Sequence, residues 1–95
     1  MKPQKKVEII IESVQKNKII TFLEKLEING YSVIPSVMGK GAHGYHDSKG
    51  LSNTLSNTYF MTICSSEKAH ELAQAIKPLI DRYGGICILS DVTIL

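Results

Sequence analysis

The sequence predicts an α+β domain in which strands and helices follow the order β-α-β-β-α-β. Four short runs are rich in β-branched residues, and two longer segments carry apolar residues at three- and four-residue spacings. This order is typical of the ferredoxin-like fold, in which right-handed crossovers place both helices on one face of a four-stranded antiparallel sheet. A chain of 95 residues fits a single domain, here residues 1–95.

The first half of the chain is expected to form a strand, a helix and a second strand. Residues 7–13 alternate in β-branched character and predict the first strand. Residues 17–29 change to a helical period, and Asn29-Gly30 provides the expected C-terminal stop. Residues 31–37 return to strand character, with Pro35 marking an edge or a bulge because proline cannot donate to the ladder.

The second half repeats the pattern in the order strand, helix, strand. Residues 58–64 predict the third strand, and Ser65 and Ser66 can cap a helix over residues 67–82. Pro78 removes one hydrogen bond near the end of that helix. After a turn at the adjacent glycines, residues 86–95 predict the last strand.

The strands are apolar on both of their faces. In the last strand Ile86 and Ile88 point to one face, while Cys87 and Leu89 point to the other. Two helices can cover only one face of the sheet. We therefore expect a homo-oligomer that packs through the uncovered face.

Composition and charge argue against several classes of function. The chain is 43% hydrophobic and 21% charged, as in ordinary globular proteins, and its net charge of +2 is too small to indicate nucleic acid or an anionic membrane. The N-terminal run predicts a strand rather than a signal peptide, and no segment has the length of a transmembrane helix. Cys64 and Cys87 stand alone in apolar runs, as buried thiols do in a reducing compartment, so we expect a cytoplasmic protein.

A long segment, residues 39–57, shows no periodicity and is expected to be a flexible, ligand-responsive loop. It opens with Gly39-Lys40-Gly41, in which the glycines let backbone N–H groups approach an anion while lysine supplies charge. Without a complete phosphate-loop motif, the same glycines are also consistent with a plain exit from a strand. The segment ends in a duplicated tetrapeptide, LSNTLSNT, for which we have no mechanism.

A second glycine pair, Gly84-Gly85, follows the second predicted helix. It is consistent with a helix C-cap, and it also presents backbone donors where a loop of a neighbouring subunit can meet them. Arg82 and Tyr83 lie beside it and suit contacts to phosphate and to a base.

Other chemistry is weaker in this sequence. His43, His46 and Asp47 form an H-x-x-H-D pattern that can ligate a metal, but no cysteine partner stands beside it. Cys64 and His70 have no third group that would orient them as a triad. We therefore expect no enzyme activity.

The element order, the run NGYSVIP, the GKG that opens the long loop and the run RYGGICILSD together resemble the PII signalling superfamily. The branch that the chain resembles most is that of the PII-like proteins of carbon metabolism, which includes the partner of a cyanobacterial bicarbonate transporter and the carboxysome-associated PII-like protein. The resemblance covers the whole chain. It implies a homotrimer that binds an adenine nucleotide in each cleft between subunits, and a loop, the T-loop, that docks on a target protein.

The resemblance also implies roles for individual residues. Ser32 matches a threonine near the base and ribose, residues 39–41 match the start of the T-loop where phosphate is contacted, and residues 83–86 match a turn with backbone donors from the neighbouring subunit. His43 lies where some relatives have a loop arginine. The expected nucleotide-binding residues are Ser32, Gly39, Lys40, Gly41, His43, Arg82, Tyr83, Gly84, Gly85 and Ile86.

The sequence departs from the nitrogen-signalling PII proteins, and the departures bear on the ligand. Those proteins carry a lysine before the last strand and an R-x-R pair after it, which hold the outer phosphates of ATP. Neither is present here, and Tyr45 does not match the tyrosine that some members uridylylate. ADP, AMP or cyclic AMP are therefore the expected effectors, with bicarbonate as a further candidate.

Two other functions share this strand order. A metal-responsive trimer resembling the divalent-cation tolerance proteins would need His43, His46 or the cysteines as ligands. An RNA-recognition domain would need aromatic residues within characteristic motifs on the central strands, and the strands here lack those motifs.

Overall fold

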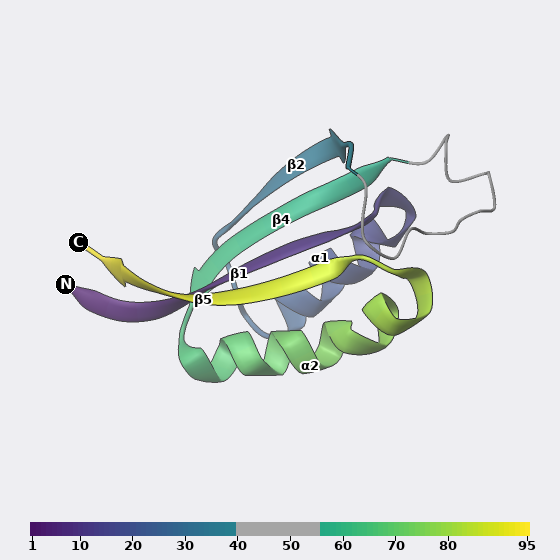
Figure 1. Cartoon of the computed structure of the whole chain (residues 1–95). Coiled ribbons are helices and arrows are strands. Elements are labelled where there is room, and N and C mark those ends of the chain that lie inside the picture. Colours follow the sequence, from purple (N-terminus) through teal and green to yellow (C-terminus); the bar gives the residue numbers. More distant parts are fainter. Residues whose placement is uncertain (40–55) are drawn as a thin grey trace.

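The computed structural model describes residues 1–39 and 56–95, and its elements confirm the predicted order. Strand β1 is followed by a short 3-10 helix, η1, and by helix α1; β2, β4, α2 and β5 complete the described chain (Figure 1). Their bounds are β1 Lys2–Glu12, η1 Ser13–Gln15, α1 Lys16–Lys25, β2 Tyr31–Val37, β4 Asn57–Cys64, α2 Ser66–Tyr83 and β5 Ile86–Ile94.

The four strands form one antiparallel sheet in the order β2-β4-β1-β5, and both helices cover the same face (Figure 1). The predicted ferredoxin-like fold is therefore confirmed. Strand β1 begins at Lys2, five residues before the predicted start, and its polar first residues pair with β5 from Lys2↔Ile94 onward. The sequence pattern did not predict this extension, because these residues do not alternate between apolar and polar. Backbone pairing with β5, rather than burial of side chains, maintains it.

The core lies between the sheet and the two helices. Strand β1 contributes alternate residues, and the helices contribute the apolar stripes that the sequence predicted. The buried apolar residues are Val7, Ile9, Ile11, Ile19, Leu23, Ile28, Phe60, Cys64, Ala69, Leu72 and Ile76. Neither helix of the described residues is long and apolar enough to cross a membrane.

Helix α1 ends earlier than predicted and without a glycine. Its last residue is Lys25, and Glu27 takes the left-handed conformation with φ 59°. The Glu27 N–H donates to the Glu24 carbonyl at 3.0 Å, and the Ile28 N–H donates to the Leu23 carbonyl at 2.8 Å. This is a Schellman motif in which buried Ile28 and Leu23 supply the accompanying apolar contact. The prediction of a stop at Asn29-Gly30 was therefore wrong.

Helix α2 begins as predicted. The Ser65 hydroxyl accepts a hydrogen bond from the Lys68 N–H at 3.1 Å, which caps the first turn. The helix ends where the Gly84 N–H donates to the Ile80 carbonyl at 2.8 Å. It delivers the chain into β5 at one edge of the sheet.

Strand β2 forms the other edge of the sheet and contains a bulge, as Pro35 predicted. Its register against β4 shifts between Ile34 and Val37, and Ser36 adopts a positive φ of 60° within the shift. Pro35 has no backbone N–H, and the bulge places it at a position of the edge strand where no N–H is needed for a hydrogen bond to β4.

Candidate functional site

The predicted nucleotide-binding residues form two groups at opposite edges of the sheet. Ser32 lies on β2 and Gly39 just after it, while residues 82–86 join α2 to β5. Strands β4 and β1 separate these edges, so three strand spacings of about 4.8 Å place the edge strands about 14 Å apart. Lys40, Gly41 and His43 lie outside the described residues. Among the described residues, one chain therefore does not bring Ser32 and Gly39 together with residues 82–86.

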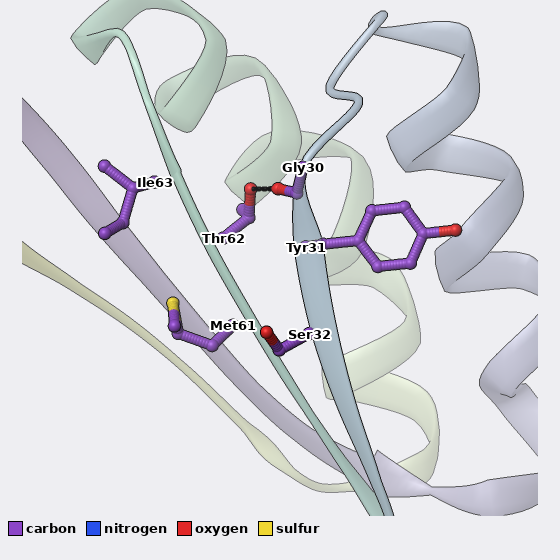
Figure 2. A pocket seen from close by; sticks show the side chains of 6 residues that line it. All are labelled: Gly30, Tyr31, Ser32, Met61, Thr62 and Ile63. Carbon is purple, nitrogen blue, oxygen red and sulfur yellow. Dashed lines mark hydrogen bonds between the residues drawn. The ribbon is translucent and has the colours of Figure 1, made fainter.

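On the β2 side, Ser32 lines a shallow depression of about 310 Å³. Figure 2 shows Ser32 and Met61 side by side, as their cross-strand pairing requires, with the Tyr31 ring directed away from them. The Thr62 hydroxyl donates to the Gly30 carbonyl at 2.5 Å, which fixes the chain where it enters β2. The lining residues are Gly30, Tyr31, Ser32, Met61, Thr62 and Ile63.

At the α2–β5 turn both glycines have positive φ, 84° for Gly84 and 110° for Gly85. A side chain on Gly85 would place its Cβ only 2.5 Å from the Ile10 carbonyl oxygen, whereas the space around Gly84 is open. Gly85 therefore permits close approach to β1 in addition to its unusual backbone. The Gly84 N–H already donates to Ile80, so a phosphate at this turn would share that donor.

Beside the glycines, Arg82 and Tyr83 form a stacked pair. The Arg82 guanidinium lies over the Tyr83 ring, 5.4 Å from its centroid. Arg82 is exposed at the last turn of α2. The pair thus presents a charge and an aromatic surface at the same edge of the sheet.

The sheet face opposite the helices, which we call the open face, is crossed by two rows of paired residues. The row Ile34–Tyr59–Ile10–Ile86 is wholly apolar or aromatic, and the next row is Ser32–Met61–Glu8–Ile88. Ile34, Ile86 and Ile88 are 52%, 48% and 42% exposed. This agrees with the prediction that the strands are apolar on both faces.

Glu8 and Tyr59 form a polar pair on the open face that the sequence did not reveal. The Tyr59 hydroxyl donates to Glu8 Oε2 at 2.6 Å, and Lys6 Nζ lies 3.8 Å from the same oxygen. The hydrogen bond to Glu8, followed by burial and by the charge of Glu8, raises the pKa of Tyr59 above its ordinary value. The two residues are 51 positions apart, so only the strand register could bring them together.

Three hydroxyl groups meet where the long loop returns to the sheet. Ser13 Oγ lies 2.9 Å from Ser56 Oγ and 2.7 Å from Thr58 Oγ1, and the Ser13 N–H donates to the Ser56 carbonyl at 2.8 Å. Strand β4 begins at Asn57, within the predicted loop. This cluster ties Ser56 and the start of β4 to η1.

The cysteines and the candidate metal ligands do not form a site among the described residues. Cys64 and Cys87 are free, and burial raises the pKa of both thiols. Within residues 1–39 and 56–95, no three His, Cys, Asp or Glu side chains are grouped as metal ligands. His43, His46 and Asp47 lie outside this part of the chain, so the metal hypothesis is not tested.

Comparison with known structures gives three informative matches. CPII, a nitrogen regulatory PII-like protein from Thiomonas intermedia K12 solved with ADP, AMP and bicarbonate, is 22% identical; the match covers 98% of this chain and 93% of CPII with a TM-score of 0.80. A PII-like signaling protein from Thermus thermophilus is 24% identical over 99% of this chain and 90% of its own, with a TM-score of 0.76. The ATP complex of GlnK from B. subtilis is 15% identical over 97% and 84%, with a TM-score of 0.69.

No curated protein sequence matches the chain. The family model described as nitrogen regulatory protein P-II matches residues 4–95, almost the whole chain. This agrees with the fold that the solved structures share and with the resemblance in the GKG and YGGI runs. The chain therefore belongs to the nitrogen regulatory protein P-II family.

Proposed function

We propose that this protein is a non-enzymatic PII-like regulator of the cytoplasm that binds an adenine nucleotide between the subunits of a homotrimer. The observation that carries the proposal is the separation of the two groups of site residues. Ser32 and Gly39 belong to one edge of the sheet, and Arg82, Gly84 and Gly85 belong to the other. A second copy can place the turn of one chain against the β2 edge of the next, which completes a cleft.

The open face supplies a reason for the chains to associate. The row Ile34–Tyr59–Ile10–Ile86 forms a continuous apolar and aromatic surface across all four strands. Apolar surface of this kind gains free energy when it is removed from water, at roughly 25 cal/mol per Å². Packing through this face leaves the two edges of each sheet at the seams between subunits.

The ligand is an adenine nucleotide with few phosphates, ADP, AMP or cyclic AMP. Arg82 provides a cationic side chain at the turn, and Lys40 would provide another from the segment that follows β2. The related fold of CPII has been solved with ADP, AMP and bicarbonate, which supports these ligands and adds bicarbonate as a second effector. The turn before β5 reads RYGGI and lacks the lysine that nitrogen-signalling PII proteins carry there, which argues against tight ATP binding.

The segment between β2 and β4, residues 39–56, is the output of the regulator. A nucleotide that contacts Lys40 binds one loop conformation better than others and shifts the loop toward that conformation by this difference in affinity. The shifted loop docks on or leaves a target in inorganic-carbon or nitrogen metabolism, such as a bicarbonate transporter or a carboxysome-linked protein.

Calorimetry with AMP, ADP, ATP and cyclic AMP, with and without bicarbonate, tests the ligand on protein whose mass in solution has been measured by light scattering. Lys40→Ala and Arg82→Ala should each weaken binding by about 1.5–3 kcal/mol, because each removes a charge-assisted hydrogen bond. Lys77→Ala is the matched control, because Lys77 lies on α2 and is already paired with Asp81 at 3.0 Å. No binding of any adenylate, or a monomer at all concentrations, would refute the proposal.

A mixing experiment tests whether the two groups of residues act across a seam. Lys40→Ala and Arg82→Ala chains are mixed in equal amounts, unfolded and refolded together. In random trimers, about one quarter of the interfaces between subunits should combine the native Lys40 of one chain with the native Arg82 of the next. These seams should bind nucleotide with native affinity. If the mixture shows no native-affinity sites, the two residues do not act together from different chains.

A further inference from the structure

Glu8 occupies the centre of the open face. Its cross-strand partners are Met61 on β4 and Ile88 on β5, and on β1 the next residues of the same face are Lys6 and Ile10. The central position of β1 in the strand order places this carboxylate away from both sheet edges. A carboxylate thus lies between two apolar cross-strand partners and next to the row Ile34–Tyr59–Ile10–Ile86.

The carboxylate is only partly satisfied within one chain. Oε2 accepts the hydrogen bond from Tyr59 and also lies nearest to Lys6. Among the residues that the structure describes, no hydrogen bond reaches Oε1. The side chain is 26% exposed, so water can still solvate it when the chain is alone.

Packing of a second copy on this face would remove that water. An ionised carboxylate loses solvation free energy on burial, and for Glu8 only the Tyr59 hydrogen bond and the 3.8 Å ion pair with Lys6, both at Oε2, offset that loss. Oε1, which accepts no hydrogen bond among the described residues, would then favour the neutral form. Identical chains would each bring a Glu8 to the same interface, and their like charges repel. Lys6 on β1 and Tyr59 on β4 are the titratable neighbours; β5 and β2 present Ile88 and Ser32, which carry no charge.

The geometry points to proton-linked self-association, in which Glu8 takes up a proton when the open faces of identical chains pack together. The proton comes from solvent and binds Oε1, while Tyr59 keeps its hydrogen bond to Oε2. This inference rests on the homotrimer of the proposed function. Because the associated state binds more protons, association strengthens as the pH falls, by up to about tenfold per Glu8 for each pH unit.

Sedimentation at a series of protein concentrations between about pH 8 and about pH 5, at constant ionic strength, measures the association constant and its pH slope. The wild-type chain should associate more tightly at the lower pH. Glu8→Gln is neutral at every pH and keeps an oxygen that can accept from Tyr59, so it should associate tightly with a flat profile. Glu24→Gln, which removes an exposed carboxylate of α1, is the matched control and should follow the wild type.

The outcomes separate this inference from the proposed function. If the wild type is a trimer whose association constant does not change with pH, or if Glu8→Gln keeps the wild-type slope, the inference fails and the trimer stands. A chain that stays monomeric at every pH refutes both. If the trimer is too tight to dissociate by dilution, the concentration dependence of the thermal midpoint, with circular dichroism to verify folding, gives the same comparison.

Discussion

The two faces of the sheet are built from the same strands, but in the single chain one face is buried beneath the helices and the other is exposed. Phe60 and Tyr59 are neighbours on β4, yet Phe60 is 1% exposed beneath the helices while Tyr59 is partly exposed on the open face. The covered face is completed by residues of its own chain. The open face carries comparable apolar residues but also Glu8, whose hydrogen bond to Tyr59 is made at the surface. The difference shows that apolar alternation identifies both faces, while only packing decides which one the chain covers itself.

The largest effect should come from the covered face. Phe60→Ala should lower the free energy of unfolding by about 3–5 kcal/mol, because it leaves a cavity among residues that cannot fully close it. Urea denaturation at two protein concentrations measures it. Tyr59→Ala on the open face is the matched comparison. The loss of unfolding free energy in Tyr59→Ala should depend more strongly on protein concentration than the loss in Phe60→Ala. An equal concentration dependence in both variants would break the distinction between the two faces.

A smaller loss is expected where β5 joins the sheet. Gly85→Ala should cost about 2–4 kcal/mol, because the new Cβ meets the Ile10 carbonyl and the positive φ is retained. Gly84→Ala, with a φ of 84° and a ψ of −178° but open space, should cost less, about 1–3 kcal/mol. Thermal unfolding of the two variants compares them directly. If Gly84→Ala proves the more damaging, contact with β1 is not what requires a glycine at residue 85.

A gain is expected at the end of α1, on the covered side. Glu27→Gly should raise the free energy of unfolding by about 0.5–1 kcal/mol, because glycine accepts the left-handed conformation that glutamate holds at a cost. Glu24→Gly, inside the last turn of the same helix, should instead lower it by about 1 kcal/mol. Chemical denaturation measures both changes. A loss of stability in Glu27→Gly would mean that the glutamate side chain contributes more than its backbone conformation costs.

The smallest effect should be seen in titration of the open face. The folded chain holds the Tyr59 proton more tightly than the unfolded chain does, since the Glu8 hydrogen bond raises the pKa of Tyr59. This contribution to stability is complete below the ordinary tyrosine pKa of about 10 and is lost as the pH rises through the raised value. Tyrosinate absorbance, taken as the difference between the wild type and Tyr59→Phe, follows the group. Glu8→Ala, which removes the acceptor, should shift that transition to lower pH, and an unchanged transition would exclude the Glu8 hydrogen bond as its cause.

Much of the fold could be predicted because its signals are local. Apolar spacing predicted both helices, Ser65 predicted the start of α2, and Pro35 predicted the bulge in β2. The errors arose where local signals were absent or misleading. The first residues of β1 are polar and are held by β5, and α1 ends at a left-handed glutamate although a glycine lies three residues further on.

The sequence by itself determined the order of the elements, the apolar character of both sheet faces and the glycine pair of the α2–β5 turn, since each depends on neighbours within a few positions. Tertiary structure alone decided that Ser32 and Arg82 lie at opposite edges of the sheet and that Glu8 meets Tyr59. Strand order and register join residues far apart in the chain, and no local propensity encodes either. That is the physical reason why the two halves of the candidate site could be named from the sequence, while their separation within one chain could not.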